Sequence, residues 1–121
     1  MNPTDPFLIR PGCWLIRSQL DDLNRADFQT VYFALLLDIK RPGKSTGEAE
    51  FSILADVDFP CKKVVIRKGA RGTGVTAAYV TQFNDGSIVI LFIKEGKNLS
   101  LRDLNDIREA YREEQRSRGD E

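Results

Sequence analysis

Three β-rich segments between residues 62 and 93, separated by turn signals, constrain the fold most strongly. The segments "KKVVIRK" (62–68) and "TAAYVTQF" (76–83) contain many β-branched and aromatic residues, which favour strands. Between the second and third segments, "NDGS" (84–87) predicts a hairpin turn, because an Asp-Gly pair tolerates the positive φ of a tight turn. The third segment, "SIVILFI" (87–93), is apolar on both faces, as expected of a central strand. This order predicts antiparallel strands joined by short connections.

The segments before residue 62 leave two interpretations open. Residues 27–39 place apolar side chains at the spacing of one helix face, but they also alternate as a strand would, and their length slightly favours a helix. Residues 48–59 alternate apolar and polar side chains and predict a strand, apart from Leu54. Residues 13–28 fit either a short helix or a strand. Prolines make residues 1–12 an irregular arm.

A helix is predicted after residue 99. Ser100 is suited to the N-cap position, and Asp103 follows three residues later in an arrangement close to a capping box. Apolar side chains then recur on a narrow stripe that includes Leu104 and Ile107. We expect residues 116–121 to fray, because nothing apolar follows Gln115.

These elements predict one α+β domain over residues 1–121. It has an antiparallel sheet of three to five strands, one or more N-terminal helical segments and a C-terminal helix. Hydrophobic residues make up 41% of the chain and charged residues 30%, as in globular proteins. The longest apolar runs are too short to cross a bilayer, and no secretory segment is visible. We therefore expect a cytoplasmic protein with no membrane contact.

The chain contains two cysteines and no histidine. The cysteines fit a reduced compartment and are expected to be small buried residues. The missing histidine removes the commonest metal ligand and the commonest general base. We expect no metal and no cofactor.

Basic residues gather around the loop between the first two β-rich segments. The cluster consists of Lys62, Lys63, Arg67, Lys68 and Arg71. Glycines follow in "GARGTG" (69–74), but the stretch lacks the Gly-Lys-Ser/Thr ending of a Walker loop and the spacing of a dinucleotide fingerprint. Such cations can line a phosphate-binding surface, or they can be solvated and protect a sheet edge from aggregation.

Lys94 and Lys97 are expected to join this cluster, because adjacent strands would bring them to the same end of the sheet. A local basic patch can bind RNA even though the 18 basic and 18 acidic residues give no net charge. Tyr79 and Phe83 share one strand face, where aromatic rings stack on bases or, more often, pack in a core.

From Lys62 to Glu113 the order of features resembles the RelE/ParE toxin superfamily, especially its HigB-like and phage-derived branches. The residues that carry the resemblance are "KKVVIRKGARGTG", "AAYV", "NDGSIVILFIKEGKNLS" and "LRDLNDIREAY". The resemblance implies two N-terminal helices, an antiparallel sheet and a C-terminal helix. The chain departs from the family pattern at residues 75–77, where an arginine is usual, and at Phe92, where a tyrosine often precedes the lysine.

The resemblance also implies a toxin of a toxin–antitoxin system that cleaves mRNA on the ribosome without a metal. Its partners would be RNA, the ribosome and an antitoxin or another protein. The catalytic residues that it implies are Lys63, Arg67, Arg71 and Lys94. The resemblance adds Tyr79 as a residue that stacks on a base. From the basic cluster we expect Lys62, Lys68 and Lys97 to bind RNA as well.

Two other functions stay open. One is a non-catalytic binding or inhibitor protein, such as a phage or host interaction module, which forms a stable protein complex and cuts no RNA. The other is a β-rich assembly subunit in which residues 28–59 form a hairpin. Helix content separates the last function from the others, because the toxin fold requires helices before and after the sheet.

Overall fold

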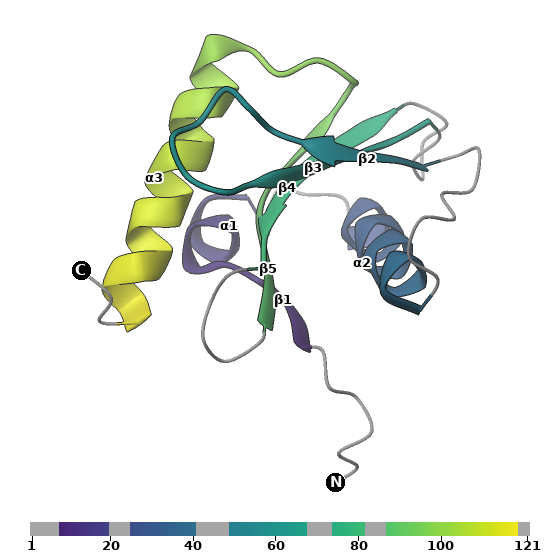
Figure 1. Ribbon diagram of the computed structural model, residues 1–121, viewed down its shortest axis with the longest axis horizontal. Helices are drawn as coiled ribbons and strands as arrows, with labels where there is room; N and C mark the ends of the chain where they lie inside the picture. The colour runs from purple at the N-terminus through teal and green to yellow at the C-terminus, as the bar shows by residue number, and fades with distance from the viewer. Residues whose placement is uncertain (1–7, 20–24, 41–48, 68–73, 82–86, 119–121) are drawn as a thin grey trace, which may run out of the picture.

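The computed structural model describes residues 8–19, 25–40, 49–67, 74–81 and 87–118 (Figure 1). Its elements in chain order are β1 (Leu8–Pro11), α1 (Cys13–Ser18), α2 (Arg25–Lys40), β2 (Ala49–Ile53), β3 (Lys62–Ile66), β4 (Val75–Val80), β5 (Ser87–Glu95) and α3 (Leu101–Arg118). The strands form one sheet in the order β1-β5-β4-β3-β2. The fold is therefore α+β, with helices before and after most of the sheet.

The sheet is mixed, and the prediction of an antiparallel sheet is wrong at one edge. Strands β2 to β5 pair antiparallel, but β1 pairs parallel to β5, with Ile9 opposite Ile88. Strand β1 lies in the segment that was expected to be an irregular arm. Its prolines concealed it, because a short edge strand tolerates a proline at its end, where no donor is needed. Ile9 is buried in the core.

Helix α2 covers one face of the sheet, so residues 27–39 are helical and the alternative strand is wrong (Figure 1). Val31 and Leu35 are fully buried, and they lie four residues apart on the face that meets the sheet. They pack with side chains from β3, β4 and β5, including Val64, Ala77 and Ile90. The β-hairpin proposed for residues 28–59 is therefore absent from the described residues.

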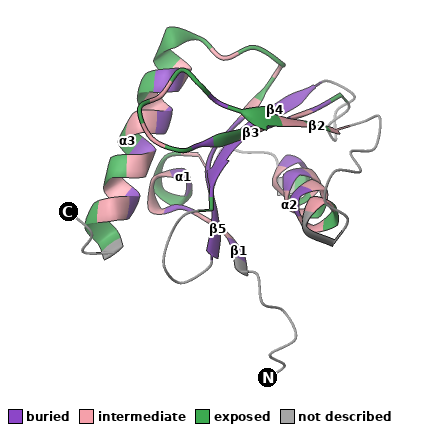
Figure 2. Cartoon of the chain, viewed as in Figure 1, coloured by how far each residue is buried: buried purple, intermediate pink, exposed green. Residues whose placement is uncertain are grey.

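Helices α1 and α3 cover the opposite face (Figure 1). Leu104 and Ile107 of α3 pack there against β4 and β5. A bulge in β5 sends Leu91 and Phe92 to this same face, since the register steps from Ala78 opposite Phe92 to Tyr79 opposite Ile90. Figure 2 shows that β4 and the middle of β5 are buried throughout, as predicted for a central strand.

Strand β2 is shorter than the alternation over residues 48–59 predicted. It ends at Ile53, and Leu54 is buried on the α3 side, where its N–H donates to the Cys61 carbonyl at 2.9 Å. The chain from residue 55 to residue 60 then passes beside α3 before β3 begins. Leu54 had broken the alternation, and it marks the point where the strand ends.

Polar side chains tie the N-terminal elements to the rest of the molecule. The buried Glu114 of α3 accepts a hydrogen bond from Arg10 Nη2 at 2.6 Å and another from the Cys13 N–H at 3.0 Å. The Gln19 amide bonds both the carbonyl and the N–H of Ile93, at 2.9 and 3.1 Å. Gln19 thus satisfies the edge of β5 beyond the end of β1.

Helix α3 continues through Arg118, past the point where fraying was expected. Late residues still make contacts, since Arg116 lies 3.6 Å from Glu109 and Ser117 Oγ accepts from Cys13 Sγ at 3.5 Å. Residues 119–121, the last part of the stretch that was expected to fray, lie outside the described residues. Residues 84–86 of the predicted turn also lie outside them. None of the described helices is both long and apolar enough to span a membrane.

Candidate nucleic-acid interface

Lys97 lies across the end of the sheet at which β3 ends and β4 begins. A Cβ on Gly74 would sit 2.8 Å from Lys97 Cγ and 3.4 Å from the Ile66 carbonyl oxygen, so the lysine stem covers the glycine backbone beside β3. The Gly96 N–H donates to the Gly74 carbonyl at 2.7 Å and fixes this end of the β4–β5 pair. A side chain at residue 74 would therefore require Lys97 to shift.

Lys63 projects from the same side of the sheet as Lys97. It lies opposite Ala78, which packs in the cluster on the α3 side, and Gly74 shares that side because it is an even number of residues from Ala78. Arg67 directly follows β3 and is exposed, while Lys63 is half-buried. We call Arg67 and Lys97 the basic sheet end, and Lys63 lies on the same side of the sheet, four residues and about 13 Å further back along β3.

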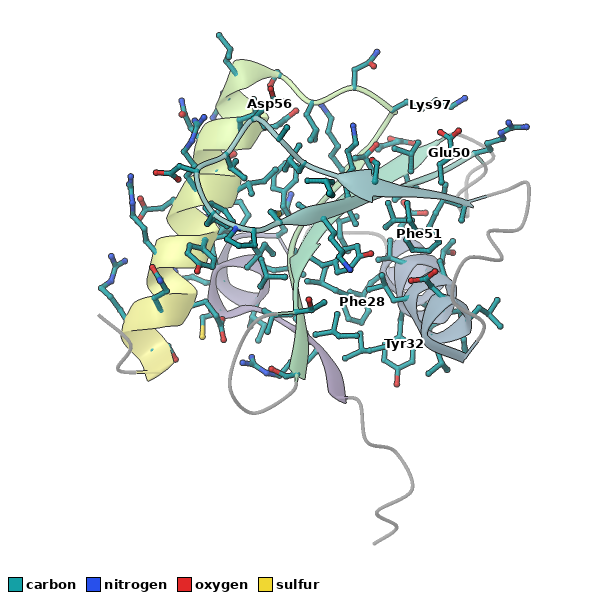
Figure 3. The ribbon with its side chains drawn as sticks, in the orientation of Figure 1. Phe28, Tyr32, Glu50, Phe51, Asp56 and Lys97 are labelled. Carbon is teal, nitrogen blue, oxygen red and sulfur yellow. The ribbon has the colours of Figure 1, made fainter. Side chains whose placement is uncertain are left out.

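Acidic Glu50 flanks the basic sheet end on strand β2. It lies opposite Val65 of β3 and is exposed, and Figure 3 shows it and Lys97 at the same end of the sheet. In the described part of the chain, no ion pair joins Glu50 to Lys63, Arg67 or Lys97. The carboxylate reduces the positive potential at this edge of the sheet.

Lys94, for which the resemblance implied a catalytic role, projects from the same side of the sheet because it lies opposite Thr76, but its ammonium group is ion-paired. Its Nζ donates to Asp103 Oδ2 at 2.6 Å. The same carboxylate oxygen accepts from the Ser100 N–H at 2.8 Å, and the Asp103 N–H donates to Ser100 Oγ at 3.1 Å. The predicted capping box is confirmed, and Lys94 completes it as a structural residue at the start of α3.

The environment of Asp103 alters its acidity. Partial desolvation favours the neutral acid, but the hydrogen bonds from Lys94 and Ser100 outweigh it and hold the pKa of Asp103 below its usual value. The carboxylate is therefore charged at neutral pH and keeps its ion pair with Lys94.

Tyr79 is in the core and is not available to stack on a base. Its side chain is 3% exposed and packs on the α2 side of the sheet, and burial raises its pKa. Lys62 lies opposite Tyr79 in the register, so it projects from the α2 side, away from Lys63. The two adjacent lysines of β3 thus serve different faces, which the alternation of a strand dictates.

Lys68, Arg71 and Phe83 fall outside the described residues.

Cys61 is buried as expected, and desolvation raises the pKa of its thiol to about 12, while Cys13 is half-buried. Among the described residues, no three acidic or cysteine side chains gather closely enough to hold a metal ion.

The predicted site is therefore divided. The structure puts Arg67 and Lys97 at one end of the sheet and Lys63 about 13 Å away on the same side, pairs Lys94 with the helix cap and places Tyr79 in the core. No family model, curated protein or solved structure compared with this chain matches it. The resemblance to the RelE/ParE superfamily stays a prediction from the order of residues.

Proposed function

We propose that the protein is a toxin-like RNA-binding protein that contacts the phosphates of mRNA through the basic sheet end and cleaves the RNA without a metal. The observation that supports the binding is the position of Lys97 over Gly74, which puts a cation from the β5–α3 connection beside β3. Cleavage is the finer part of the proposal, and it rests on the resemblance.

The geometry suits electrostatic work. The guanidinium of Arg67 can contact two phosphate oxygens at once, and Lys97 beside it acts as a point charge on a flexible stem. Lys63, about 13 Å along β3, can contact another phosphate of the same RNA strand. In cleavage, the ribose 2′-hydroxyl gives its proton to water as its oxygen attacks the adjacent phosphorus, the bond to the 5′-oxygen breaks, and the 5′-oxygen takes up a proton from water. The cations would stabilise the negative charge that builds up on the phosphoryl oxygens. An antitoxin that covers the same cations would block this activity.

Induced expression in bacteria tests the proposal. We expect growth arrest and scission of cellular mRNA, and we expect Arg67→Ala combined with Lys97→Ala to restore growth at an equal level of soluble protein. Lys62→Ala is the matched control, because it removes a cation from the adjacent position but from the opposite face. Normal growth with abundant soluble wild-type protein would contradict the toxin function.

The outer face of α2 favours a second candidate, an assembly role. Phe33 and Leu37 are 58% and 56% exposed and lie one turn apart. Ile53, which is 77% exposed, projects from the same side of the sheet, since it lies opposite Lys62. We propose a second copy of the chain as the occupant, because the surface is apolar and the chain has zero net charge, so two copies do not repel each other.

Sedimentation analysis tests this second candidate. A dimer that Leu37→Glu converts to a monomer would support it. Leu101→Glu is the control, because Leu101 is 80% exposed but lies on α3. A monomeric wild-type protein at high concentration would exclude the assembly role while leaving the RNA-binding proposal untouched.

A further inference from the structure

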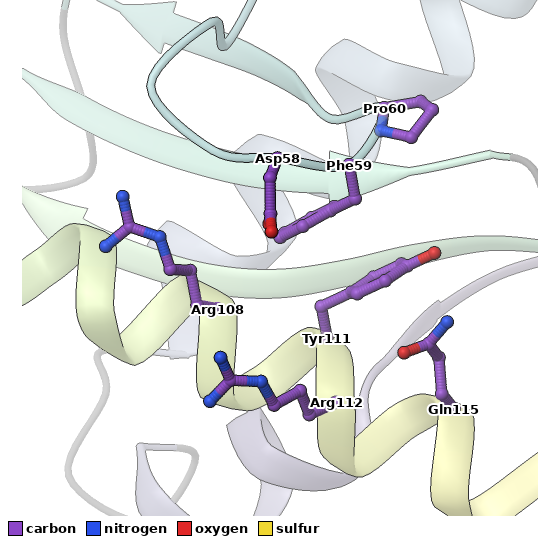
Figure 4. Close-up of a pocket in the computed structure, with 7 residues that line it drawn as sticks. All are labelled: Asp58, Phe59, Pro60, Arg108, Tyr111, Arg112 and Gln115. Carbon is purple, nitrogen blue, oxygen red and sulfur yellow. The ribbon is translucent and has the colours of Figure 1, made fainter. Parts of the chain in front are cut away.

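A pocket of about 380 Å³ lies between α3 and the chain that leads into β3 (Figure 4). Asp58 and Phe59 line it from the side of the loop, and Arg108, Tyr111 and Arg112 line it from the helix. The volume is within the range of small-molecule sites. The pocket uses none of the residues of the basic sheet end.

Two aromatic rings form the apolar part of the pocket. Phe59 and Tyr111 are stacked, with ring centroids 3.8 Å apart and planes inclined by 5°. Both residues are half-buried, so parts of the rings remain exposed. A planar group can pack against such a surface, because an exposed ring edge attracts the face of another aromatic system.

Two arginines form the cationic part. The guanidinium of Arg108 is held by the Asp56 carbonyl at 2.8 Å and by Asn105 Oδ1 at 2.9 Å. An arginine has five N–H donors, so these two bonds fix its orientation and leave others for a ligand. Arg112 approaches Glu109 only at 3.7 Å, and its side chain is 64% exposed. One hydrogen-bonded guanidinium and one exposed guanidinium thus line the same pocket.

We propose that this pocket binds a nucleoside monophosphate, with the phosphate on Arg108 and Arg112 and the base on the Phe59–Tyr111 pair. Arginine recognises phosphate through paired hydrogen bonds, and nucleobases pack on aromatic side chains. Asp58 accepts hydrogen bonds from the sugar hydroxyls and repels further phosphates. The nucleotide comes either from the free pool or from a 5′-phosphorylated RNA end, which present the same chemistry.

The proposal is tested by titrating the full chain with AMP and monitoring binding by calorimetry or by amide chemical shifts. We expect Arg112→Ala to weaken AMP binding by about tenfold or more, because the variant loses a charge-assisted contact to phosphate. Arg116→Ala is the matched control, because Arg116 lies near the same Glu109, is 59% exposed and does not line the pocket.

Inorganic phosphate and adenosine serve as partial probes, and each should bind more weakly than AMP. A 5′-phosphorylated trinucleotide RNA that binds through Arg112 more tightly than AMP identifies an RNA end as the source, while preference for AMP identifies the free nucleotide. Three results overturn the proposal: no binding of AMP at millimolar concentration, equal loss in Arg112→Ala and Arg116→Ala, or phosphate alone binding as well as AMP.

Discussion

The two long helices cover opposite faces of the sheet by different means. Helix α2 uses apolar side chains on most of its circumference, so that Val31 and Leu35 are buried while Phe33 and Leu37 remain exposed. Helix α3 presents a narrow apolar stripe and is otherwise mostly polar. Five ion pairs among the described residues include a residue of α3. Apolar burial therefore holds α2, whereas α3 adds polar anchors to its apolar contacts.

This difference shows where chemistry can take place. The pocket and the basic sheet end both lie on the α3 side, where the sheet contributes Lys63 and the helix contributes Arg108 and Arg112. On the α2 side, the outer face of the helix exposes the apolar Phe33 and Leu37. Substitutions on the two helices should therefore lower the stability of the protein for different physical reasons. Measuring the free energy of unfolding of such variants tests the difference between the helices.

The largest effect is expected at Glu114. Arg10→Met leaves the buried carboxylate of Glu114 without the compensating charge of Arg10, and an uncompensated buried charge costs about 3 kcal/mol or more in the free energy of unfolding. Glu113→Gln is the control, because Glu113 pairs with the exposed Arg17 on the same helix, and its effect should be much smaller. Urea denaturation of both variants measures the difference, and equal losses would show that Glu114 is not an anchor.

A comparable loss is expected in α2 from purely apolar burial. Leu35→Ala should lower the free energy of unfolding by about 2–5 kcal/mol, because it leaves a cavity against the sheet. Leu37→Ala, two residues away and 56% exposed, should change it by no more than about 0.5 kcal/mol. Similar losses of stability for both variants in thermal unfolding would contradict the assignment of Leu35 to the buried face of α2 and of Leu37 to its exposed face.

A smaller effect is expected at the start of α3. Asp103→Asn weakens the capping box and the pair with Lys94, and should cost about 1 kcal/mol at neutral pH. The pKa of Asp103 is lowered in the folded state, so its stabilising contribution is complete above the ordinary carboxylate pKa of 3.8 and disappears as the pH falls through the lowered value.

Urea denaturation of wild type and Asp103→Asn across this acidic range tests the assignment, and the two proteins should converge in stability at low pH. Lys94→Met should destabilise the protein while leaving RNA affinity near the wild-type value. A strong loss of RNA affinity in a fully stable Lys94→Met protein would return Lys94 to the binding site.

The periodic elements could be predicted from the sequence. Strands β3 to β5, the helical alternative for residues 27–39 and the capping box at Ser100 all follow from local spacing and side-chain chemistry. Strand β1 could not be predicted, because four residues carry too little periodicity and their partner lies about 80 positions later in the chain.

The candidate site was predicted less well, for a physical reason. The cations around β3 are visible in the sequence, but only the register shows that Lys62 and Lys63 project from opposite faces. Only the fold shows that Asp103 engages Lys94. The Phe59–Tyr111 pair depends on a contact between a loop and a helix that are distant in sequence, so no local signal marked it.

The central claim is that the basic sheet end binds RNA. Its most direct test is the fluorescence anisotropy of a labelled single-stranded RNA, titrated at several salt concentrations with wild type, Lys63→Ala/Arg67→Ala/Lys97→Ala and Lys62→Ala. Log affinity falls with log salt concentration, and each lost phosphate contact makes this slope less steep by about 0.7. We predict that the triple variant loses at least about tenfold in affinity with a flatter slope, while Lys62→Ala retains both. Wild-type affinity and slope in a folded triple variant would contradict the claim.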